Sequence, residues 1–182
     1  MRSALPFALI LASLLTTAQA RLGETTQEIA VRYGRPLKGV KTESPATVAG
    51  LYETNGIRIV VGFYQNMSYY EQFQKLDLTK PGSFLEIDET EREILLKANC
   101  KGCDWNGNVV AKQGFVPGKP IGMTTVYETT YDRSDGLAKA TYDSRSRILA
   151  VRSLQVEKQV QEDEKRRQEE EAKRQRETLK GF

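Results

Sequence analysis

The motif with intrinsic chemistry in this chain is Cys100-Lys101-Gly102-Cys103. This spacing occurs in haem attachment sites, zinc sites and thiol–disulfide oxidoreductases. Haem attachment requires a histidine directly after the second cysteine, where this chain has Asp104, and a structural zinc site requires four ligands, whereas the chain has no other cysteine and no histidine. The pair is therefore expected to be a local structural disulfide, an idle thiol pair or a redox pair.

The position of the two cysteines bears on the redox alternative. Redox-active pairs with this spacing lie at the N-terminus of a helix, where the positive end of the helix dipole lowers the pKa of the thiol. Here Cys100 follows a predicted helix that begins near Asp88, so the pair lies at the end whose dipole disfavours a thiolate. A disulfide between Cys100 and Cys103 is the preferred interpretation, and a thiol–disulfide protein acting through this pair is the alternative function.

The absence of histidine from the sequence restricts the possible chemistry further. Histidine is the commonest general base near neutral pH and the commonest metal ligand, so His-dependent triads, zinc hydrolases and His-ligated haem are excluded. Carboxylates are abundant, but no pair stands out by spacing, and solvent exposure is their usual state. We predict no catalytic residue, no metal, no cofactor and a non-enzymatic protein.

Residues 1–20 have the features of a cleavable signal peptide: a basic residue at Arg2, an apolar run over 4–15, and Ala18-Gln19-Ala20 before the cleavage point. The apolar run is too short for a comfortable membrane anchor, and no later segment approaches the roughly 20 apolar residues that a span needs. The residue after the cleavage point is Arg21, so lipid anchoring is disfavoured. We predict an exported protein, periplasmic or secreted, with no stable membrane span.

Local signals in residues 21–79 predict one short helix and three antiparallel strands. Thr25 and Glu28 form a capping box, and Gly34 followed by Pro36 ends the helix. Asn55-Gly56 between two β-rich runs is a strong hairpin signal, and a second turn is expected at 65–66.

The same order of elements recurs over residues 86–154. Asp88 is an N-cap with Glu91 three residues later, and three strands are expected to turn at 134–136 and at 143–146. The loop-rich segment 80–85 separates the two copies. We therefore predict an α+β protein of two tandem units, each a short helix packed on a three-stranded antiparallel sheet.

Residues 155–182 form a third region, a charged helical tail. From 157 to 180 there are eight acidic and eight basic residues, and pairs such as Glu162 with Arg166 have the favourable i, i+4 spacing. A coiled coil would need apolar residues at a and d positions through several heptads, and these are lacking. A solvated helix held by charge pairs is predicted.

The strands of the first unit are rich in aromatic residues, and alternation divides these residues between two faces. It is expected to separate Phe63 from Tyr64 and Tyr69 from Tyr70. If Phe63 faces the helix, Tyr64 lies on the open face of the sheet.

The open face is the predicted binding site because tyrosine and arginine together are enriched at binding hot spots. The residues assigned to it are Tyr52, Arg58, Tyr64 and Tyr70. The formal net charge of +3 without a clustered basic face gives no case for nucleic acid. The expected partner is therefore another protein of the cell envelope.

The stretch "GETTQEIAVRYGRP" at 23–36 resembles the helix of the BamE (SmpA/OmlA) family, in which a glycine, a Thr or Ser cap, a short helix and Gly-x-Pro precede a small antiparallel sheet. Two such units in tandem resemble the β-lactamase inhibitory protein family, whose two sheets lie side by side and form a concave, aromatic-lined binding face. The resemblance implies the tandem fold and a protein-binding role. BamE-type proteins are lipoproteins with one unit, the inhibitor has more cysteines, and neither family implies the charged tail.

Overall fold

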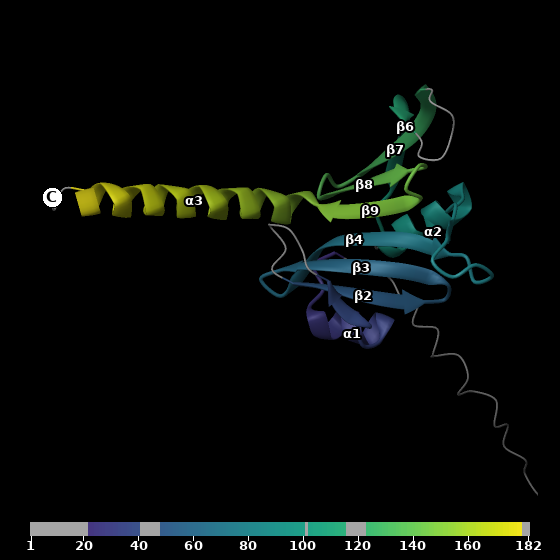
Figure 1. Cartoon of the computed structure of the whole chain (residues 1–182), viewed down its shortest axis with the longest axis horizontal. Coiled ribbons are helices and arrows are strands. Elements are labelled where there is room, and N and C mark those ends of the chain that lie inside the picture. The colour runs from purple at the N-terminus through teal and green to yellow at the C-terminus, as the bar shows by residue number, and fades with distance from the viewer. Residues whose placement is uncertain (1–21, 41–47, 101, 116–122, 180–182) are drawn as a thin grey trace, which may run out of the picture.

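The computed structural model describes residues 22–40, 48–100, 102–115 and 123–179 (Figure 1). The predicted signal peptide, residues 1–20, lies outside the described residues. Three helices are present in the described part: α1 (Thr26–Tyr33), α2 (Glu89–Ala98) and α3 (Leu154–Leu179). Within the same ranges, none of the helices combines the length and the apolar character needed to cross a bilayer.

Nine strands of the described residues form one antiparallel sheet. They are β1 (Lys38–Val40), β2 (Val48–Thr54), β3 (Ile57–Tyr64), β4 (Met67–Leu76), β5 (Phe84–Leu85), β6 (Trp105–Phe115), β7 (Met123–Arg133), β8 (Ala138–Asp143) and β9 (Ile148–Ser153). Their order across the sheet is β1-β2-β3-β4-β9-β8-β7-β6, and β5 pairs with β4. The predicted α+β class with antiparallel strands is therefore confirmed.

Local signals place most of the elements. Thr25 and Asp88 both form complete capping boxes, in which the side chains of Glu28 and Glu91 accept a hydrogen bond from the backbone N–H of the N-cap residue. The β2–β3 turn has positive φ at Asn55, where asparagine tolerates the left-handed conformation better than most residues. Each predicted turn of both meanders lies between two strands of the sheet.

The sheet differs from the prediction of two separate three-stranded sheets. β4 and β9 pair over four residues, from Tyr70↔Arg152 to Phe73↔Leu149, and so join the two halves into one sheet (Figure 1). β1, β5 and β6 were not expected from the sequence. In β6, Asn106, Gly107 and Asn108 interrupt the β-rich pattern that would have indicated a strand.

One face of the sheet carries the core. Buried residues of both halves and of both short helices form a single cluster, with Ile29 from α1 and Leu96 from α2. The strand residues in it are Tyr52, Ile59, Val61, Phe63, Phe73, Tyr131, Ala140, Tyr142, Leu149 and Val151. Because α1 and α2 share this cluster, they cover the same face of the sheet. We call it the inner face, and the opposite one the outer face.

A buried polar group lies beneath α1. Glu71 on β4 is fully buried, and its Oε2 accepts a hydrogen bond of 3.2 Å from the Tyr33 hydroxyl. Burial raises the pKa of Glu71 to about 7, and the positive charge of Arg32 offsets this only in part. Burial beside this carboxylate also raises the pKa of Tyr33. Arg32 in turn pairs with Glu24.

The first turns of α3 are not fully solvated, contrary to the prediction for the tail. Val160 is 4 % exposed, and the Asp163 carboxylate accepts a hydrogen bond of 2.7 Å from the Tyr64 hydroxyl. Farther along, every described side chain from Arg166 to Arg176 is exposed, and Figure 1 shows the helix projecting away from the sheet. The charge pattern indicated the helix correctly, but the three apolar residues at its base, Leu154, Val156 and Val160, were too few to signal packing.

Two truncations should separate the packed base of α3 from its exposed end. A chain that ends at Val156 loses Val160 and Asp163. Its free energy of unfolding should fall by about 1.5 to 3 kcal/mol, the usual contribution of one buried valine side chain. Every described side chain that is lost from a chain ending at Arg167 is exposed, so the free energy of unfolding of this chain should change by less than about 0.5 kcal/mol. Urea denaturation followed by circular dichroism measures both. Equal stability of the two truncated chains would contradict packing of the helix base.

Candidate functional site

The four residues predicted to form the open-face site do not lie together. Tyr52 is 3 % exposed and belongs to the core cluster, so its assignment to the open face is wrong. The reason is the register: Tyr52 pairs with Ile59 and therefore shares the inner face with it. The absence of a Cβ at Gly50 lets the Tyr52 ring lie across that position.

Arg58 and Tyr64 both lie on β3 but at opposite ends. Arg58 forms a 2.7 Å ion pair with Glu53, and its guanidinium lies 5.2 Å from the centre of the Phe84 ring. Tyr64 lies six positions after Arg58 along the strand, which corresponds to about 20 Å. The hydrogen bond to Asp163 of α3 raises the pKa of Tyr64 and occupies its hydroxyl. Neither side chain is a free anchor on an open surface.

A β-bulge changes the expected orientation of Tyr69. Gly62 pairs with Tyr70 and Phe63 pairs with Ser68, so Tyr69 has no partner on β3. Two residues of β4 thus face the single residue Gly62, as in a β-bulge. A Cβ built on Gly62 would lie 3.4 Å from the Tyr69 ring and 3.5 Å from the Cβ of Tyr70. Tyr69 and Tyr70 therefore share the outer face, and the expectation that they point to opposite faces is wrong.

The outer face is hollowed where β4 meets β9. The hollow has a volume of about 490 Å³, spans β4, β9, β8 and β7, and is bordered by the first turn of α3. It is lined by Tyr70, Gln72, Glu128, Lys139, Thr141, Asp143, Ser146, Ile148, Ala150, Arg152, Leu154 and Glu157. Of the four predicted site residues, Tyr70 is the one in this lining.

Contacts within the hollow hold Tyr70 and Arg152 in place. The Arg152 guanidinium lies 5.6 Å from the centre of the Tyr70 ring, and its Nη1 is 3.9 Å from the Glu157 carboxylate. The Tyr70 hydroxyl donates a 2.8 Å hydrogen bond to Gln72. Burial raises the pKa of Tyr70, and the charge of Arg152 opposes that effect. A tyrosine ring and an arginine thus lie together, and both residue types are enriched at protein-binding surfaces.

Sequence reasoning missed most of this lining because the residues come from two distant parts of the chain. Arg152 and Thr141 lie beside Tyr70 and Gln72 only because β9 pairs with β4. Alternation along β8 and β9 does indicate which side chains leave the core: Lys139 and Thr141 alternate with buried Ala138, Ala140 and Tyr142. No local sequence pattern, however, indicates that β9 pairs with β4.

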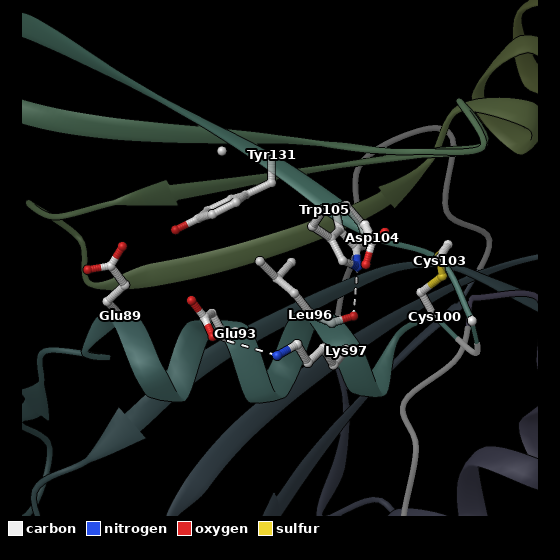
Figure 2. Close-up of a pocket in the computed structure, with 11 residues that line it drawn as sticks. Glu89, Glu93, Leu96, Lys97, Cys100, Cys103, Asp104, Trp105 and Tyr131 are labelled. Atoms are coloured by element: carbon white, nitrogen blue, oxygen red, sulfur yellow. Dashed lines mark hydrogen bonds and ion pairs between the residues drawn. A yellow bond between two sulfur atoms is a disulfide. The ribbon is translucent and has the colours of Figure 1, made fainter.

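A second pocket, of about 570 Å³, lies on the inner side between α2, β6 and β7 (Figure 2). Glu89 and Glu93 approach it from α2, and Tyr131 and Trp105 approach from the strands. The Trp105 indole Nε1 donates a 2.8 Å hydrogen bond to the carbonyl of Leu96. This hydrogen bond ties α2 to β6.

The cysteine pair borders this second pocket (Figure 2). Cys100 and Cys103 are at disulfide distance, with their Cα atoms 5.7 Å apart. They follow Asn99, the C-cap of α2, as the sequence predicted. Among the described residues, no group of three or more His, Cys, Asp or Glu side chains has an arrangement that could hold a metal ion.

Comparison with known proteins gives no match: no family model, curated protein or solved structure is significantly similar to this chain. The likeness to BamE-type and β-lactamase inhibitory proteins therefore remains a sequence resemblance.

Proposed function

We propose that this chain is an exported, non-enzymatic protein of the cell envelope that binds another protein through the outer face of its sheet. The observation that carries the proposal is the 490 Å³ hollow in a sheet whose two short helices both lie on the other face. A concave surface lined by Tyr70 and Arg152 has the residue types enriched at binding hot spots. The binding face is thus centred on the β4–β9 seam rather than on Arg58 and Tyr64.

The tandem-unit description is retained within this proposal. We infer that α1 with β2–β4 and α2 with β7–β9 are two copies of one helix-plus-meander unit. Pairing of β4 with β9 then creates the hollow, because it brings Tyr70 and Gln72 of the first unit beside the lining residues of the second unit and of the base of α3. Neither unit alone would offer the whole surface.

For the cysteine pair we infer a structural role. A disulfide here would fix the turn between the end of α2 and Trp105, which the Trp105–Leu96 hydrogen bond already holds close. The pair lies at the negative end of the α2 dipole, which disfavours the thiolate that a redox reaction needs.

Site-specific photocrosslinking in the native envelope tests the proposed face. A benzoylphenylalanine at Thr141, inside the hollow, is expected to give a discrete crosslinked adduct with the partner. The same probe at Ile94, an exposed residue of α2, is expected to give none. Adding Tyr70→Ala and Arg152→Ala should reduce the Thr141 adduct at least tenfold, because losing two hot-spot residues costs about 2 kcal/mol or more. Identical adducts from Thr141 and Ile94 would rule out this face.

A further inference from the structure

The strand β6 forms one end of the sheet, and its outer edge has no partner strand in the described part of the chain. It is 11 residues long, whereas β1 at the other end has three. Figure 1 shows β6 and β7 rising away from the rest of the sheet. A long free edge leaves a row of backbone N–H and C=O groups that a further strand can pair with.

The outer part of β6 and β7 is only two strands wide. β8 pairs with β7 from Glu128 to Asp132, so the pairs from Ala111↔Tyr127 to Phe115↔Met123 have no third strand from the described residues beside them. Hydrogen bonds between Ser144 and Tyr127 attach the base of the ribbon to the body. An isolated two-stranded ribbon is at best marginally stable in water, and a third strand stabilises it.

Apolar side chains lie exposed at the base of this ribbon and beside it on β6. Val109 is 62 % exposed, Val110 is 39 % exposed, and Tyr127 on β7 is 55 % exposed. The sequence of β6, WNGNVVAKQGF, contains no proline, and its one charged residue is Lys112. Proline, a short strand and several charges are the usual devices that keep an edge from pairing, and β6 has none of them.

We propose that β6 pairs antiparallel with β6 of a second copy of this chain, across a two-fold axis near Val109 and Val110. Residues 105–111 carry no charge, so two copies of this segment meet without opposing like charges. A two-fold axis makes one strand self-complementary, because each residue pair recurs with the two copies exchanged. The valines of both copies then cover one another on the two sides of the ribbon.

The β4–β9 seam provides a precedent for this pairing within the molecule. There two half-sheets join through four antiparallel residue pairs, with no hairpin between the strands. The β6 edge offers a longer stretch of the same kind. The opposite end of the sheet does not, since β1 is short and begins with Lys38.

Sedimentation of the mature full-length chain over a wide concentration series tests the proposal. The wild-type chain is expected to change from monomer to dimer as its concentration rises. Val109→Lys with Val110→Lys brings four lysines together at the axis and should weaken dimerisation at least tenfold. A matched control, Val31→Lys with Val48→Lys, changes two exposed valines outside β6 and should dimerise like the wild type.

Amide hydrogen exchange shows whether β6 is the surface involved. Protection of backbone amides in residues 106–111 is expected to rise with protein concentration in the wild type and to stay constant in the double-lysine variant. A wild-type chain that remains monomeric throughout the series would overturn the proposal. So would a dimer that persists in the double-lysine variant without concentration-dependent protection of β6, which would place the contact elsewhere.

Discussion

Phe73→Ala is expected to lower the free energy of unfolding by about 3 to 5 kcal/mol, the usual cost of removing a buried phenylalanine ring. Phe73 is 1 % exposed and pairs with Leu149 at the β4–β9 seam, where the two halves share one core. Because the halves share this core, unfolding of both the wild type and the variant should remain a single transition. Differential scanning calorimetry and urea denaturation of the mature chain measure the change.

Phe84→Ala is the matched control for the seam. Phe84 lies on the short strand β5 at the margin of the sheet, half-buried and in contact with Arg58. Removing the Phe84 ring should lower the free energy of unfolding by about 1 to 2 kcal/mol, because this half-buried ring buries less apolar area than the ring of Phe73. Two separate transitions in the Phe73→Ala variant would show instead that the two halves fold independently.

Glu71→Gln is expected to stabilise the protein above pH 7 and to have little effect at pH 4. The folded state keeps a proton on the buried carboxyl up to about pH 7, whereas in the unfolded chain its pKa is near 4.5. The wild type therefore loses stability as the pH rises from about 4.5 through 7. Because one pKa unit corresponds to about 1.4 kcal/mol, glutamine should recover about 3 kcal/mol above that range.

The measurement is the difference in unfolding free energy between variant and wild type from pH 4 to pH 8.5. Glutamine retains an oxygen that can accept the Tyr33 hydrogen bond, so the comparison isolates the charge. Glu169→Gln on the exposed end of α3 is the control, with an expected difference near zero across the series. A flat difference for Glu71→Gln would show that water reaches this carboxylate in the folded protein.

The helices and turns that are specified by residues close together in the sequence were predictable from it. A capping box needs only Thr25 and Glu28, three residues apart, and the turn at Asn55-Gly56 depends on the conformations that those two residues tolerate. The helical tail likewise follows from charge pairs between neighbouring turns. Such features involve residues within about four positions of one another, so the chain needs no distant contact to specify them.

The candidate site depended instead on the register between distant strands. A shift of one residue moves a side chain to the other face of a sheet, which is why Tyr52 proved to be core and the bulge opposite Gly62 placed Tyr69 beside Tyr70. The hollow around Tyr70 and Arg152 exists because β4 pairs with β9, about 80 residues farther along the chain. The sequence by itself determined the helices, the hairpins and the antiparallel class. Only the tertiary structure decided which strands are neighbours, and therefore which side chains share a surface, because this choice depends on packing one common core.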